Sequence, residues 1–174
     1  MLRTFGAANV FLLDGGLAAW VEAGLPTEAG EVRCAATEFK GNFDSAAVKD
    51  FEQLQEKIAD HAQILDARSA GRFSGAAPEP RAGLSSGHMP GATSLPFTEL
   101  AVDGRLRSPE ELREIFAAKG IDIAQPVTTT CGSGVTAAVL ALGLEIAGAP
   151  QVSLYDGSWA EYAQWPKAVI EKSV

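Results

Sequence analysis

The residue best suited to chemistry in this sequence is Cys131, which is followed by the glycine-rich run Gly132-Ser133-Gly134-Val135-Thr136. The β-branched run before it predicts a buried strand, and the alanine- and leucine-rich residues 137–146 predict a helix after it. Gly132 and Gly134 permit backbone angles that let successive N–H groups point at one centre, and the positive end of the helix adds to their effect. We therefore predict an anion cradle whose natural occupant is the Cys131 thiolate, available as a nucleophile.

The turn around Cys131 leaves several interpretations open. A small buried cysteine at a strand end would need neither glycine, and the chemical alternatives are a persulfide-forming sulfurtransferase, a cysteine phosphatase and a redox thiol. A phosphatase loop needs an arginine where this chain has Ala137. A Cys-x-x-Cys pair needs a second cysteine where it has Gly134, and the only other cysteine is Cys34. The phosphatase and this redox pair are therefore disfavoured.

Three arginines, Arg68, Arg72 and Arg81, lie in a glycine- and proline-rich segment that spans residues 66–83. The chain has only 14 Lys and Arg residues, so this concentration is notable. Arginine side chains can bind a small carboxylate with two parallel hydrogen bonds. The alternative is that they pair with Asp66 and Glu79 and fix the loop. For Arg68 we favour pairing with Asp66, so that these two residues support the site without contacting the substrate. For Arg72 and Arg81 we favour substrate binding.

The elements that must position these residues alternate between strands and helices. Such alternation predicts an α/β fold with a doubly wound, mainly parallel sheet and helices on both faces. In such sheets ligands bind beyond the carboxyl ends of the strands, where Cys131 falls. The expected elements are a helix over 50–58, strands over 63–68 and 92–97, a helix capped by Ser108-Pro109-Glu110-Glu111, a strand from Val127, a helix over 137–146, a strand from Val152 and a last helix near Trp159.

An internal repeat organises the chain. Residues 10–20 align without gaps on residues 152–162, and in each copy a short apolar strand is expected to lead into Asp-Gly and then a helix. At the same offset a partner for Cys131 would fall before Met1. We therefore expect residues 1–30 to be the C-terminal tail of a truncated first domain, 31–42 a linker that contains a bystander Cys34, and 43–174 a complete catalytic domain.

Composition narrows the classes of function. A formal net charge of −8 on 174 residues argues against binding to nucleic acid or to an anionic membrane surface. The apolar runs are too short to span a bilayer, no signal peptide is expected at Met1, and two cysteines provide no disulfide framework. These features predict a protein of a reducing compartment, and we expect it to be cytoplasmic.

The loop Cys131-Gly132-Ser133-Gly134-Val135-Thr136 resembles the active loop of the rhodanese superfamily, in its mercaptopyruvate sulfurtransferase version. Thiosulfate-specific members usually carry basic residues at the positions of Gly132 and Ser133. Similar family segments are Gly71-Arg72-Phe73, Pro78-Glu79-Pro80-Arg81 and Gly87-His88-Met89-Pro90-Gly91-Ala92. The resemblance covers nearly all of residues 43–165.

The resemblance implies roles for individual residues. Arg72 and Arg81 would bind the carboxylate and carbonyl of 3-mercaptopyruvate, and Ser133 would assist proton movement at Cys131. The amides of Gly132, Gly134, Val135 and Thr136 would cradle the transferred sulfur of a Cys131 persulfide, while His88 would be structural. A thiol such as thioredoxin, or cyanide, would accept that sulfur, and neither a metal nor an organic cofactor would be needed.

The resemblance also implies a tandem parent, in which an inactive first half contributes an acidic residue and a histidine near the nucleophile. Those residues would precede Met1, so that first domain is an expected partner of this chain. Two alternatives stay open. One is an enzyme whose main donor is thiosulfate, although a dianion would favour a cation at Gly132 or Ser133. The other is a rhodanese-like module that binds a partner without turnover.

Overall fold

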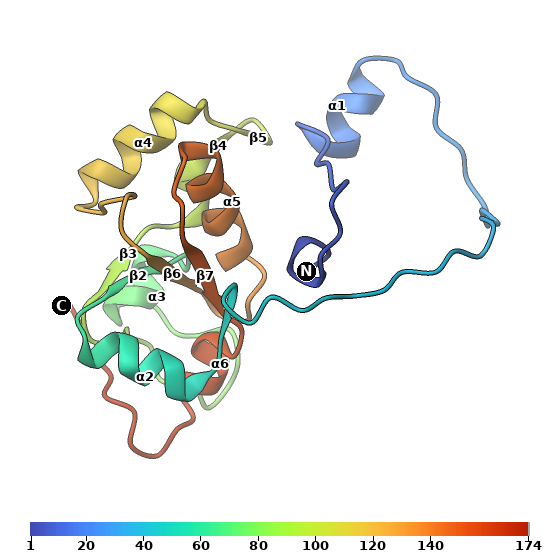
Figure 1. Ribbon diagram of the computed structural model, residues 1–174. Helices are drawn as coiled ribbons and strands as arrows, with labels where there is room; N and C mark the ends of the chain where they lie inside the picture. The colour runs from blue at the N-terminus through green and yellow to red at the C-terminus, as the bar shows by residue number, and fades with distance from the viewer. Residues whose placement is uncertain (174) are drawn as a thin grey trace.

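A five-stranded sheet forms the centre of the fold in the computed structural model, which describes residues 1–173 (Figure 1). Its strand order is β1-β7-β6-β2-β3, and all four neighbouring pairs are parallel. The strands are β1 (Val48–Lys49), β2 (Gln63–Asp66), β3 (Ala92–Ser94), β6 (Val127–Thr130) and β7 (Val152–Tyr155). The predicted α/β class with a mainly parallel sheet is confirmed.

Helices cover both faces of this sheet. Figure 1 shows α4 and α5 on one face and α2 and α6 on the other. Each face has its own apolar core: Leu112, Phe116 and Leu140 pack in one, and Leu54, Trp159 and Tyr162 pack in the other. The helices of the sheet domain are α2 (Phe51–Ala59), α3 (Ala70–Ser74), α4 (Pro109–Ala118), α5 (Ala137–Ala147) and α6 (Ser158–Tyr162).

Two of the helices begin at capping boxes. The Asp50 side chain accepts a hydrogen bond from the backbone N–H of Gln53 at the start of α2, and the Gln53 side chain accepts one from the Asp50 N–H. Ser108 and Glu111 make the same exchange at the start of α4, where Pro109 occupies the first helical position. These contacts satisfy N–H groups that have no partner within the helix.

Two predicted strands are shorter than expected. The strand predicted over 92–97 ends at Ser94, and a 3-10 turn, η2 (Phe97–Leu100), follows Pro96. The strand predicted over 63–68 ends at Asp66, whose carboxylate accepts the Arg68 N–H at 2.9 Å and turns the chain. Three features were not predicted: β1, α3 and the hairpin of β4 (Ala101–Val102) and β5 (Arg105–Leu106).

The N-terminal segment stands apart from the sheet (Figure 1). It contains a 3-10 turn, η1 (Arg3–Phe5), and helix α1 (Gly16–Glu22), and residues 26–42 are extended and exposed. The strand expected over residues 10–13 is wrong: these residues form no ladder and are exposed, since no strand of the described chain lies beside them to pair with. The matching residues of the second copy do form β7, between β1 and β6.

Ion pairs link the N-terminal segment to the sheet domain at two points. Arg3 contacts Glu145 on α5 at 2.5 Å, and Asp14 contacts Arg105 on β5 at 2.8 Å. All four side chains are exposed to solvent, and such pairs contribute little to stability. Across residues 1–173, no helix is long and apolar enough to cross a bilayer.

Candidate active site

Cys131 directly follows β6, at the carboxyl end of the sheet. Its strand neighbour β2 leads into the segment that carries the three arginines. After β2, the chain places β3 on one side of it and the later strands β6 and β7 on the other side. The direction in which successive strands are added to the sheet therefore reverses between β2 and β6. Open α/β sheets bind their ligands at this kind of switch point, which brings the two sequence-predicted segments to one place.

The loop after Cys131 turns back over the sulfur. The N–H of Gly134 donates to Cys131 Sγ at 3.1 Å, and Gly134 has a φ of 84°, a left-handed value that favours glycine. Gly132 is needed for a different reason than expected, because its φ is not left-handed. A Cβ there would lie 2.7 Å from Nη2 of Arg72, so Gly132 lets that guanidinium approach the loop.

Two opposing effects set the pKa of Cys131. Burial of the thiol raises it, because the charged form loses water. Hydrogen bonds from the Thr136 hydroxyl and from the backbone N–H groups of Ser133, Ala137 and Thr136 lower it. The hydrogen bonds prevail, and the pKa of Cys131 lies below the ordinary value for a cysteine. The loop therefore favours the nucleophilic thiolate.

Backbone hydrogen bonds from helix α6 fix the position of the Cys131 loop. The N–H of Trp159 donates to the carbonyl of Cys131 at 2.8 Å, and that of Ala160 donates to Gly132 at 3.1 Å. The helix starts at Ser158, a buried residue with a φ of 53° whose hydroxyl donates to the carbonyl of Tyr155. A non-glycine residue with such an angle is held there by its surroundings, which here position the Cys131 loop.

Arg68 is a buried structural residue. Its Nε donates to both oxygens of Asp66, at 3.1 and 2.9 Å, and its Nη2 donates to the carbonyl of Gly87 at 2.7 Å. Its Nη1 donates to Glu79 at 2.8 Å, and its guanidinium lies 4.1 Å from the centre of the Trp159 ring. The pairing with Asp66 favoured for Arg68 is present, and neither residue lines the cavity at Cys131.

Arg72 is held by the same carboxylate. Its Nε lies 3.1 Å from each oxygen of Glu79, and its Nη2 also donates to this residue. The Arg72 side chain is 24% exposed, whereas that of Glu79 is 2% exposed. Pairing with Glu79 and substrate binding are therefore compatible, because the far side of the guanidinium remains open. Sequence reasoning treated Glu79 only as a possible loop partner and missed that it joins Arg68 to Arg72.

A cavity of about 220 Å³ is lined by most of the predicted catalytic and substrate-binding residues. Gly134 does not line it and contacts the site through its N–H to Cys131 Sγ. Arg81, the third arginine, is exposed at the rim of the cavity and has no ion pair with any residue of 1–173. Asp66 and Glu79 balance the charges of Arg68 and Arg72, so Arg81 supplies the remaining positive charge. The lining residues are Arg72, Glu79, Pro80, Arg81, Leu84, Cys131, Gly132, Ser133, Val135 and Thr136.

The remaining candidates lie elsewhere. His88 is buried, its ring stacks on Phe73 with 4.0 Å between centroids, and its Nδ1 lies 2.9 Å from the Phe73 carbonyl oxygen. Cys34 is exposed in the extended segment, and His61 is exposed after α2. Within the described chain, no group of three or more His, Cys, Asp or Glu side chains could hold a metal ion.

The fold and the site together define an α/β domain that presents an activated cysteine and two arginines in one cavity. A profile of the rhodanese-like domain matches residues 48–164. The chain belongs to the rhodanese family.

Similar proteins share this chain's sequence over nearly all its length. It is 44% identical over 164 residues to the human 3-mercaptopyruvate sulfurtransferase, and 42% identical over 164 residues to the chicken thiosulfate sulfurtransferase. These alignments cover 93% of this chain but 55% and 56% of those proteins, so the chain spans about half their length. The crystal structure of SseA, an Escherichia coli 3-mercaptopyruvate sulfotransferase, superimposes with a TM-score of 0.80 at 42% identity, covering 91% of this chain and 60% of that one.

Proposed function

We propose that this chain transfers sulfur from 3-mercaptopyruvate to a thiol or cyanide acceptor through a persulfide on Cys131. One observation carries the proposal: a thiol with a lowered pKa shares its cavity with Arg72 and Arg81. Similarity to sulfurtransferases from human and Escherichia coli supports the same reaction class.

In the first step, the Cys131 thiolate attacks the sulfur of the donor. A sulfur–sulfur bond forms, the carbon–sulfur bond breaks, and its electron pair passes to the carbon as pyruvate enolate. The enolate then takes up a proton and leaves as pyruvate, a movement that we assign to Ser133 on the rim of the cavity. Arg72 and Arg81 hold the donor carboxylate and carbonyl, since forked guanidinium donors match both groups.

In the second step, an acceptor thiolate or cyanide attacks the outer sulfur, and Cys131 returns to the thiolate. Before this attack the loop amides of Gly132, Gly134, Val135 and Thr136 stabilise the terminal sulfur. Amides fixed in advance where charge develops contribute on the order of 3 kcal/mol each. Thioredoxin or a small thiol would suit as the acceptor, because the cavity is open to solvent along the exposed residues Arg81 and Val135.

Thiosulfate is the second candidate donor, which the similarity to the chicken enzyme supports. Gly132 and Ser133 offer it no side-chain cation of the kind that thiosulfate-specific members usually carry at these positions. We therefore expect a higher kcat/KM with 3-mercaptopyruvate than with thiosulfate.

Replacing Arg72 with Ala tests this assignment. We expect KM for 3-mercaptopyruvate to rise by about tenfold or more with a smaller change in kcat, because the lost contact holds the carboxylate rather than the reacting sulfur. Arg33→Ala, in the extended segment, removes the same charge as a control. An unchanged KM in Arg72→Ala would refute the role given to Arg72.

We also infer that residues 1–30 belong to a preceding domain, with 31–42 as linker and 43–174 as the catalytic domain. The exposed apolar side chains of the N-terminal segment support this, since Phe11 is 89% and Leu17 is 69% exposed. The preceding domain would then cover these residues and border the open cavity. A binding module without turnover remains the alternative if no donor reacts.

A further inference from the structure

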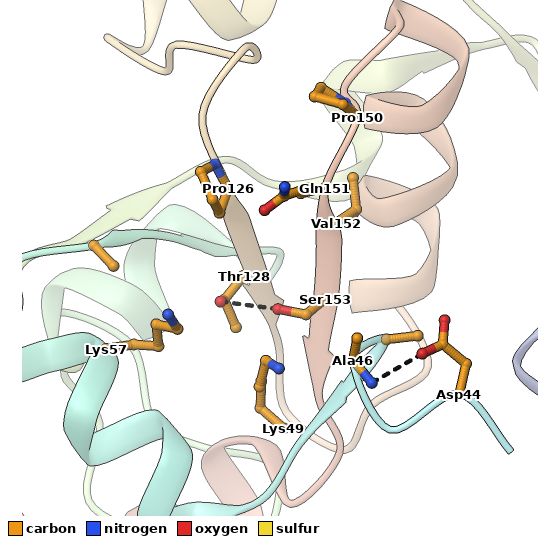
Figure 2. Close-up of a pocket in the computed structure, with 12 residues that line it drawn as sticks. Asp44, Ala46, Lys49, Lys57, Pro126, Thr128, Pro150, Gln151, Val152 and Ser153 are labelled. Carbon is orange, nitrogen blue, oxygen red and sulfur yellow. Dashed lines mark hydrogen bonds between the residues drawn. The ribbon is translucent and has the colours of Figure 1, made fainter.

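A second cavity, drawn in Figure 2, lies where β6 and β7 begin, whereas Cys131 follows the end of β6. The second cavity has a volume of about 320 Å³ and shares no lining residue with the cavity at the cysteine. Thr128 on β6 lines it, three residues before Cys131, and strand geometry places these residues about 10 Å apart. The sulfur-transfer reaction as described above makes no use of this cavity.

Two lysines from different elements line this cavity. Lys49 ends β1 and Lys57 lies in the last turn of α2, and both are half-buried. Figure 2 shows both ammonium groups directed toward the Thr128–Ser153 pair. Within residues 1–173, neither ammonium group has an ion pair or a hydrogen bond, whereas most of the other basic side chains contact a carboxylate. Two partly dehydrated positive charges around one cavity favour the binding of an anion between them.

Neutral hydrogen-bond donors complete the lining. The Thr128 and Ser153 hydroxyl oxygens are 3.0 Å apart, so one hydroxyl donates to the other and the proton of the second is free for a ligand. The Gln151 side chain also faces the cavity. Asp44 is the one carboxylate on the wall; its Oδ1 accepts the Ala46 N–H, and Figure 2 draws it at the far end of the cavity from Lys57. The lining therefore has a net positive charge in a chain of net charge −8.

We propose that this cavity is a binding site for a small tetrahedral oxyanion, such as phosphate or a phosphoryl group on a small metabolite. Lys49 and Lys57 supply the charge, and the Ser153–Thr128 pair and Gln151 supply directed donors. The volume is at the lower end of the range of small-molecule sites, about 300–1,000 Å³, which favours a small ligand over a macromolecule. This site is independent of the proposed sulfur transfer.

Titration of the full chain with inorganic phosphate, followed by ¹⁵N–¹H NMR at constant ionic strength set with chloride, tests the proposal. We expect saturable shifts at the amides of Lys49, Thr128, Gln151 and Ser153. The double variant Lys49→Gln/Lys57→Gln should weaken this binding by about tenfold or more, and Lys57→Arg, which keeps the charge, should retain it. Lys167→Gln, an exposed lysine outside the cavity, is the matched control and should bind as the wild type does.

The same titration shows where the anion binds, and a parallel titration shows which kind of anion the site prefers. Shifts confined to residues 131–136 would mean that phosphate binds only the Cys131 loop, and they would overturn the proposal, as would non-saturable shifts or equal affinity in the double variant. A small phosphomonoester in a parallel titration shows whether the site takes a phosphoryl group on a metabolite. Tighter binding of the ester, with shifts at the same amides, would assign the site to the metabolite; tighter binding of phosphate would assign it to the free anion.

Discussion

At the scale of single residues, the Cys131 thiol is governed by the competition between burial and hydrogen bonding. Burial alone would make the residue inert, as in most buried cysteines. The Thr136 hydroxyl and the loop N–H groups reverse this outcome and lower the pKa. The six-residue loop thus performs locally what a neighbouring cation does in other reactive cysteines.

The lowered pKa predicts the pH dependence of alkylation. In a Cys34→Ser background, which leaves Cys131 as the sole thiol, the rate of reaction with iodoacetamide should rise with pH around a midpoint below the ordinary cysteine pKa. The midpoint moves to lower pH because a thiol with a lowered pKa remains a thiolate, the reactive form, at lower pH. The same chain unfolded in urea should return to the ordinary midpoint; a folded midpoint at or above it would contradict the prediction.

Glu79 is expected to act as a positioning residue. Glu79→Gln removes the charge that holds both Arg68 and Arg72, so KM for the donor should rise by several-fold with a smaller change in kcat. The free energy of unfolding should fall by on the order of 2–3 kcal/mol, because Arg68 is buried. Donor kinetics and urea unfolding measure the two effects.

A matched control for Glu79 is Glu110→Gln, whose exposed carboxylate pairs with Arg113 at 3.3 Å. Its effect on stability should be within about 0.5 kcal/mol, and its KM should not change. Equal effects of the two substitutions would show that the network around Arg68 has no special role.

Several residues of the site were accessible from the sequence because their chemistry is local. The Cys131 turn and the arginine-rich segment stand out by residue type alone. The bridge made by Glu79 and the close approach of Arg72 to Gly132 depend on how two loops meet, which spacing along the chain does not give. The sequence therefore predicted that Gly132 is needed for its backbone angles, whereas the structure shows that it makes room for Arg72.

At the scale of elements, the strongest sequence signals were the ones with complete local chemistry. The Ser108-Pro109 cap and the helix after it formed as predicted, because the cap, the first-turn acids and the apolar face all agree. Short elements were missed: β1 has two residues and pairs only with β7, and α3 has five within a glycine- and proline-rich segment. Their existence depends on tertiary contacts rather than on periodicity.

Ser108→Ala tests the contribution of the α4 cap. The substitution leaves the Glu111 N–H without its side-chain partner, and the free energy of unfolding should fall by about 1 kcal/mol. Urea unfolding measures the change, and Ser108→Asp should restore most of it, since aspartate is an equally good cap. A loss as large in Ser108→Asp as in Ser108→Ala would refute a capping role.

At the scale of the whole molecule, the chain consists of a sheet domain and an extended N-terminal segment with exposed apolar side chains. The internal repeat predicts a domain boundary in this part of the chain, which stays a prediction, and the strand predicted over 10–13 did not form. An apolar run in sequence shows the capacity to pair, whereas pairing requires a neighbouring strand. The same comparison explains why the second copy, β7, is ordered between two partners.

Limited proteolysis should reveal this division. Trypsin should cut first after Arg33 and Lys40, whose side chains are 89% and 86% exposed in an extended backbone. The sheet domain should persist longer as a fragment, because most of its basic residues lie in helices or strands or form ion pairs, and cuts after the exposed Arg81 and Lys167 should come later. Mass spectrometry of early digestion products identifies the sites, and first cuts after Lys57 or Arg113 would contradict the expected order.

The most direct test of the account is the intact mass of the reduced protein after brief exposure to 3-mercaptopyruvate or, separately, to thiosulfate. We predict a gain of one sulfur atom with 3-mercaptopyruvate, little gain with thiosulfate, and none with either donor in the Cys131→Ser variant. Peptide mapping should place the added sulfur on Cys131 rather than on Cys34. A wild-type chain that gains no sulfur from either donor, or a gain that persists in Cys131→Ser, would contradict the proposal that this cysteine carries the transferred sulfur.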